Sequence, residues 1–89
     1  MPYRRTENVA RRLAERREAI VEAARALAAE GGMAAVQIAP VAVRAGIAAG
    51  TVYRYFPSKT ELVRAVMTAV SERELAAMRA AADRAPRKR

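Results

Sequence analysis

IAPVAVRAGIAAGTVYRYFPSKTEL, residues 38–62, is the stretch of sequence that decides the fold. Its first third predicts a helix from about Ile38 to Ala45, because apolar residues recur there at helical spacing. The inward face of this helix is formed by Ile38, Val41 and Ala42. Pro40 lies in the first turn, where it removes only an N–H donor that has no partner within the helix. The proline therefore does not disrupt the helix.

A glycine turn separates this helix from a second one. Gly46 breaks the first helix, and Ile47 is an apolar anchor within the turn. The second helix is expected to begin near residues 48–49 and to end at Phe56, since Pro57 disfavours helical geometry in the residue before it. Two short helices joined by such a turn form a helix-turn-helix, in which the second helix enters the major groove of DNA.

A capping box follows directly. In the sequence SKTE, residues 58–61, the Ser58 hydroxyl can accept a hydrogen bond from the backbone N–H of Glu61 while the Glu61 side chain reaches back. A further helix is expected to begin here and to extend to about Arg84. Its inward stripe is expected to contain Leu62, Val63, Val66, Met67 and Val70, continued beyond Ser71 only by Leu75 and Met78.

The segment before residue 38 predicts one long helix. Apolar residues at helical spacing begin at Val9, and the pair Gly31 and Gly32 ends the helix, since glycine is favoured where the chain turns left-handed. The apolar positions are Leu13, Ile20, Ala24, Leu27 and Ala28. The fold class is thus all-α: a homeodomain-like three-helix core with a helix-turn-helix, plus the start of a fourth helix.

Three segments are expected along the chain. Residues 1–8 lack apolar periodicity and contain Pro2, so they predict a mobile basic arm. Residues 9–66 form the helix-turn-helix DNA-binding domain. Residues 67–89 form an extension of the fourth helix and a basic tail, which ends in Arg87, Lys88 and Arg89.

The composition excludes most kinds of enzyme. The 89 residues contain no cysteine and no histidine, so disulfides, zinc sites, thiol nucleophiles and imidazole bases are absent. No cofactor and no metal are expected. No stretch is long and apolar enough to span a membrane, and the arginine-rich N-terminus has no apolar core of a signal peptide. We therefore expect a cytoplasmic protein without a membrane partner.

The charge favours a polyanionic partner. The formal net charge is +8, and no acidic residue occurs from Gly31 to Thr60, although Arg44, Arg54 and Lys59 lie in that stretch. A surface that lies against phosphates excludes carboxylates, so double-stranded DNA is the expected partner. Two other functions remain open. The chain could be a nonspecific nucleic-acid-binding or nucleoid protein, for which the charge alone suffices. It could also be a cationic amphipathic peptide that acts on membrane surfaces.

The second helix of the motif has two different faces. At about 100° per residue, Val52 and Phe56 share the inner side, while Gly50 and Arg54 lie nearly opposite. The flanks carry Ala49, Thr51, Tyr53 and Tyr55. Glycine allows close approach of the backbone, arginine can offer a two-pronged donor to guanine, and hydroxyls can donate to phosphates.

Further basic residues are candidates for DNA contact. Lys59 lies beside the N-terminus of a helix, where exposed amides and the helix dipole attract anions. Arg4 and Arg5 precede the first expected helix and can enter the minor groove as part of a basic arm. For the remaining N-terminal arginines, DNA contact and a solvated helix face paired with glutamates both remain open. These are Arg11, Arg12, Arg16 and Arg17.

Residues 42–62, AVRAGIAAGTVYRYFPSKTEL, resemble the signature of the tetracycline-repressor (TetR) family of bacterial regulators, and the resemblance extends over about residues 16–66. It implies DNA contacts at Gly50, Thr51, Tyr53, Tyr55 and Lys59, and a role in operator choice for Ala49 and Arg54. It also implies a homodimer on a near-palindromic operator and repression relieved by a small molecule.

This sequence departs from the family pattern in two ways. It has Ala28, Gln37, Pro40 and Ala48 where relatives often have phenylalanine, threonine, an acid and serine, which reduces capping and core volume. Relatives also carry a C-terminal domain that binds the effector and dimerises. We therefore expect an isolated or truncated DNA-binding domain, or dimerisation through the last helix, and no effector bound to these residues.

Overall fold

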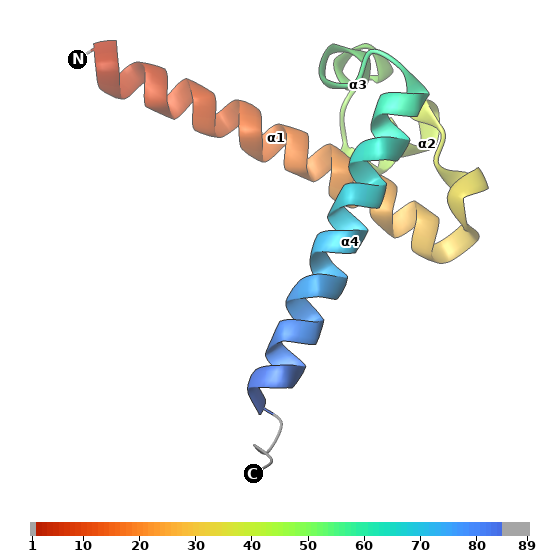
Figure 1. Cartoon of the computed structure of the whole chain (residues 1–89). Coiled ribbons are helices and arrows are strands. Elements are labelled where there is room, and N and C mark those ends of the chain that lie inside the picture. The colour runs from red at the N-terminus through yellow and green to blue at the C-terminus, as the bar shows by residue number, and fades with distance from the viewer. Residues whose placement is uncertain (1, 85–89) are drawn as a thin grey trace.

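The computed structural model of the chain describes residues 2–84, with side chains from Arg5 onward, and the regular secondary structure of these residues is entirely helical. In order they are α1 (Pro2–Gly31), a short 3-10 helix η1 (Met33–Ala35), α2 (Ile38–Ala45), α3 (Ala49–Tyr55) and α4 (Lys59–Arg84). Figure 1 shows α1 and α4 as two long helices that meet at the three-helix body. The all-α fold is confirmed. The basic tail from Arg87 lies outside the described residues.

Two glycines make the predicted turns. Gly32 and Gly46 have φ of 78° and 73°, the left-handed region that costs other residues energy. After α2 the backbone N–H of Gly46 donates to the carbonyl of Val43 at 3.1 Å, and that of Ile47 donates to Ala42 at 3.0 Å. These bonds satisfy carbonyls at the end of α2 and direct the chain into α3.

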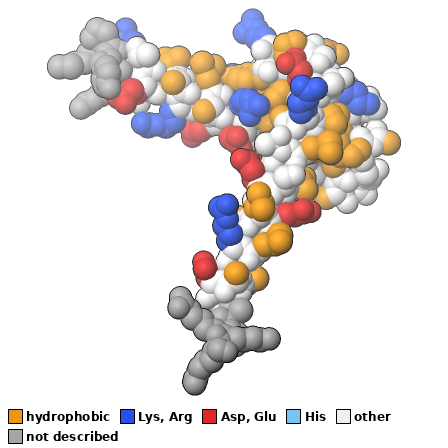
Figure 2. Space-filling model, in the orientation of Figure 1, with side chains coloured by type: hydrophobic (Ala, Val, Ile, Leu, Met, Phe, Trp, Pro, Cys, Tyr) orange, Lys and Arg blue, Asp and Glu red, His pale blue; other side chains and the backbone are white. Residues whose placement is uncertain are grey.

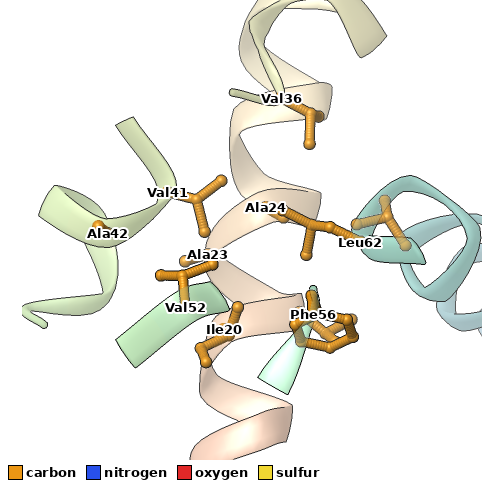
Figure 3. Packing of buried hydrophobic residues seen from close by; sticks show 11 residues of the cluster. Ile20, Ala23, Ala24, Val36, Val41, Ala42, Val52, Phe56 and Leu62 are labelled. Carbon is orange, nitrogen blue, oxygen red and sulfur yellow. The ribbon is translucent and has the colours of Figure 1, made fainter. Parts of the chain in front are cut away.

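A small aliphatic core lies where the helices meet, as Figure 3 shows. It consists of Ile20, Val21, Ala23, Ala24, Val36, Val41, Ala42, Val52, Phe56, Leu62 and Val66. The expected inward residues of α2 and α3 are therefore confirmed, with Ile38 packed at the edge. Each fully buried aliphatic or aromatic side chain contributes about 1.5–3 kcal/mol. With few large side chains, the core depends on each of them.

The expected arm over residues 1–8 is corrected, because α1 begins at Pro2. Proline suits the first position of a helix, since its φ is already helical and its missing N–H has no partner there. Arginine, glutamate and alanine continue the helix without any packing. The first buried residue is Ile20, whereas Val9 and Leu13 are half exposed. Figure 2 shows this first half of α1 standing free of the body.

The inward stripe of α4 is shorter than expected. Leu62 and Val66 are buried, and Val63 is half-buried. Met67 is 59% exposed, and the other expected members of the stripe are exposed as well: Val70, Leu75 and Met78. Met67 lies about 140° around the helix from Leu62, so the two cannot face the same neighbour. Beyond its first turns α4 leaves the body, as Figure 1 shows.

None of the described helices combines the length and the apolar character that a membrane span requires.

One ion-pair group joins α1 to α4: Glu22 accepts hydrogen bonds from Arg25, at 2.7 Å, and from Arg73 across the gap between the helices, at 3.2 Å. The pKa of Glu22 is lowered by these arginines, chiefly by the hydrogen bond from Arg25. Glu22 and Arg73 are 52% and 61% exposed and Arg25 is 25% exposed, so these pairs contribute little to stability.

Candidate nucleic-acid interface

Two buried side chains hold α3 in place. Val52 is fully buried, and Phe56, directly after the helix, is 2% exposed. The Arg17 guanidinium of α1 lies over the Phe56 ring, 5.0 Å from its centroid, which adds a cation–π contact. The inner face of α3 is therefore fixed in the core that it shares with α1 and α2, and its opposite face is directed outward.

The outer face of α3 carries the predicted DNA-contact residues. Ala49, Gly50, Tyr53 and Arg54 are exposed, while Thr51 and Tyr55 are half-buried on the flanks. A Cβ added to Gly50 would meet no atom within 4 Å, so the space outside this residue is open. Among the described residues, Arg54 has no hydrogen-bond or ion-pair partner, which leaves its guanidinium free to bind a base or a phosphate.

The start of α4 provides the next cation. The backbone N–H of Glu61 donates to the Ser58 hydroxyl at 3.2 Å, which confirms the predicted cap. The expected return bond from the Glu61 side chain is not formed. Lys59 is the first residue of α4 and is exposed. Since it is unpaired within residues 2–84, Lys59 is available beside the positive end of the helix dipole.

Arg44 differs from the other cations of the motif. Its Nη1 donates to Glu30 Oε1 at 2.7 Å, linking α2 to the end of α1. This hydrogen bond lowers the pKa of Glu30 and raises that of Arg44. The stretch from Gly31 to Thr60 contains no acidic residue, but its Arg44 forms an ion pair with Glu30 of α1. The two residues are 14 positions apart, so no local spacing signals the pair.

The N-terminal arginines lie on a helix rather than on an arm. Arg5 is exposed on α1, while the side chain of Arg4 lies outside the described part. A helix is about 10–12 Å wide with its side chains, whereas the minor groove is about 6 Å wide. The expected entry of an arm into the minor groove is therefore corrected. As part of α1, these arginines remain candidates for contact with phosphates.

Two short helices, a glycine turn and an exposed polar face on the second helix define the class of helix-turn-helix DNA-binding proteins. A sequence model of the family described as bacterial regulatory proteins, tetR family, matches residues 20–66, more than half of the chain. The chain belongs to this family, which confirms the resemblance seen in the sequence. As a family of regulators it also supports the exclusion of an enzyme.

Similar proteins include the HTH-type transcriptional repressor KstR of three bacteria. The chain is 51% identical to that of Rhodococcus jostii (strain RHA1) over 59 residues, which are 66% of this chain and 28% of the relative. It is 55% identical to those of Mycolicibacterium smegmatis and Mycobacterium tuberculosis, in each case over 49 residues. These 49 residues are 55% of this chain, 24% of the Mycolicibacterium smegmatis protein and 22% of the Mycobacterium tuberculosis protein. The chain thus spans about a quarter of their length. No solved structure matches it significantly.

Proposed function

We propose that this chain is the operator-reading part of a bacterial transcriptional repressor, in which α3 enters the major groove of a specific DNA sequence. The observation that carries the proposal is the division of α3 into a buried face and an open polar face. A rigidly held helix with unpaired donors on its outer side is what direct reading of bases requires. The similarity to proteins named transcriptional repressors supports the same function.

The roles of the residues follow from their chemistry. Arg54 offers two parallel donors to guanine, and Gly50 lets the backbone come close to the base edges. Lys59 binds a phosphate. The hydroxyls of Thr51, Tyr53 and Tyr55 donate to phosphates at the edges of the groove. Ala49 presents a small apolar surface that suits a thymine methyl group.

The partners are double-stranded DNA and a second copy of the protein. A dimer places two α3 helices on half-sites about one helical turn apart, which requires a near-palindromic operator. Its place is the cytoplasm, where bacterial DNA lies. We assign no effector to residues 2–84, since the relatives extend far beyond the matched segment.

Binding to an operator obtained by selection from random sequences tests the proposal. The wild-type chain is expected to stay bound at moderate salt when random DNA competes, because base contacts survive where counterion release alone does not. Arg54→Ala is expected to cost about 1–3 kcal/mol on the selected site only. Lys59→Ala is expected to weaken binding about equally on all sequences and to reduce the salt slope by about one.

Two results would contradict this assignment. If random DNA competes the wild-type chain off the labelled operator as readily as unlabelled operator does, the protein is a nonspecific nucleic-acid binder. If Arg54→Ala and Lys59→Ala weaken binding to all sequences alike, Arg54 does not read a base. Circular dichroism of each variant without DNA controls for loss of the fold.

A further inference from the structure

The first half of α1, over residues 5–19, places no buried side chain in the core. Every described side chain from Arg5 to Ala19 is exposed, and burial begins only at Ile20. These 15 residues extend about 22 Å at 1.5 Å per residue. In Figure 1 this half projects sideways at the end of the molecule that carries α3, whereas α4 leaves in another direction. Its surface is therefore free for another molecule.

Three arginines form a row along this helix: Arg5, Arg12 and Arg16. Their separations of seven and four residues bring them within about 40° of one another around the helix, over about 16 Å of its length. None of the three pairs with a carboxylate among the described residues. We call this set the arginine row.

The acidic residues of α1 lie on other sides of the helix. Glu7, Glu18 and Glu22 are about 100–160° from the arginine row, and Glu15 is about 80° from it. Figure 2 shows acidic side chains gathered along the edge of α1 that faces α4. Arg11 lies among them on a solvated face, and it forms no ion pair with them within the described residues. The arginine row is separated from most of this acidic side, whereas Glu15 lines the same groove as Arg12 and Arg16.

The arginine row ends beside the helix-turn-helix. Arg12 and Arg16 line a groove between α1 and the α2–α3 turn, together with Glu15, Ala45 and Ile47. The row therefore approaches the segment just before α3, whereas Lys59 follows α3. Cations thus lie beside the segment that precedes the reading helix and in the segment that follows it.

We propose that the arginine row binds phosphates of operator DNA beyond the base pairs that α3 reads. One strand of B-DNA carries a phosphate every 3.4 Å along the axis, so a row about 16 Å long spans about five phosphates. Only Val9 and Leu13 interrupt the polar surface here, too little apolar area for a membrane-bound helix. A second copy of the row would be repelled by its charge. This inference rests on the proposed function.

The test compares two lengths of DNA. One duplex contains only the selected operator, and the other adds ten base pairs of unrelated sequence on each side. The wild-type chain is expected to bind the longer duplex more tightly and with a steeper salt dependence. For Arg12→Ala/Arg16→Ala, the salt slope on the longer duplex is expected to fall by about 1.8. Between 50 and 200 mM salt, the wild type then loses about twelvefold more affinity than the variant.

The matched control is Arg11→Ala/Arg79→Ala, which removes the same charge from other helix faces. It is expected to keep the advantage of the longer duplex. Equal losses in both variants, or an advantage that survives in Arg12→Ala/Arg16→Ala, would overturn the proposal. Alanine favours helix, so circular dichroism should show the fold retained.

Two further outcomes separate the proposals. If the wild-type chain prefers the selected operator but gains nothing from the longer duplex, the arginine row is wrong and the reading helix stands. If it shows no preference for the selected operator, the proposed function fails and the arginine row with it. Binding to phosphatidylserine vesicles that depends on Arg12 and Arg16, without any gain from flanking DNA, would assign the row to membranes instead.

Discussion

Replacing Gly50 by alanine is expected to stabilise the fold and to weaken DNA binding. Gly50 is the second residue of α3, and a Cβ there would meet no atom within 4 Å. Alanine in place of glycine inside a helix gains about 0.5–1 kcal/mol, and the first turn suggests about 0.5 kcal/mol. For a domain of this size, that gain raises the Tm by about 2–4 °C.

The added methyl group of Gly50→Ala would stand on the side of α3 opposite Val52. If the backbone of α3 approaches the base edges there, the methyl group pushes the helix outward and lengthens its other contacts. We expect the Kd for the selected operator to rise at least about tenfold, or about 1.4 kcal/mol. Thermal denaturation by circular dichroism and fluorescence anisotropy with labelled operator measure the two effects. A variant that is more stable and binds as tightly as the wild type refutes the close approach at Gly50.

Three further predictions concern stability. Leu62→Ala empties a fully buried position and is expected to lower the free energy of unfolding in urea by about 2–5 kcal/mol. Met67→Ala, at a residue 59% exposed, should change that free energy by less than about 0.5 kcal/mol. Similar losses in the two variants would contradict the assigned face of α4. Ala48→Ser supplies a capping oxygen at a residue whose φ of −75° and ψ of 149° already suit an N-cap, and should raise stability by about 1 kcal/mol. The pKa of Glu30 is lowered from its ordinary 4.5 by the hydrogen bond from Arg44, so its contribution is present above pH 4.5 and is lost as the pH falls through the lowered pKa. Urea unfolding across that range should show a weaker acid dependence for Glu30→Gln, and an unchanged one would exclude the pair.

Residues 38–62 were predictable because local signals mark the ends of their helices. The bounds of α2 agree with the expected ones, and Gly46 has the left-handed φ that its place required. The predicted end of α3 is one residue too late: the helix ends at Tyr55, and Phe56 is extended, with φ of −133° and ψ of 92°. This extended geometry is what the following proline imposes.

The free halves of α1 and α4 could not be predicted in the same way. Apolar spacing reveals a helix only where one face packs, and residues 5–19 bury no side chain in the core. In α4 the sequence offers two apolar faces, and it does not tell which one meets α1. The structure selects the face of Leu62 and Val66 and leaves that of Met67 open.

Spacing identified the reading face better than it identified the surrounding charges. The two faces of α3 follow from helix geometry and from the residues of α3 alone. The pairing of Arg44 with Glu30 depends on how α1 and α2 meet, which no single segment contains. The alignment of Arg5 with Arg12 and Arg16 became visible only once residues 2–8 were found to be helical.

Because α2 and α3 lack the capping residues that are common in the family, their stability depends more on the core. Gln37 and Ala48, the N-cap residues of α2 and α3, form no side-chain cap. A helix of seven residues is not stable alone, so α3 owes both its existence and its orientation to Val52 and Phe56. The side chain that anchors the helix and the side chain that reads DNA are a few residues apart on opposite faces. Any change that loosens the anchor therefore also displaces the reading face.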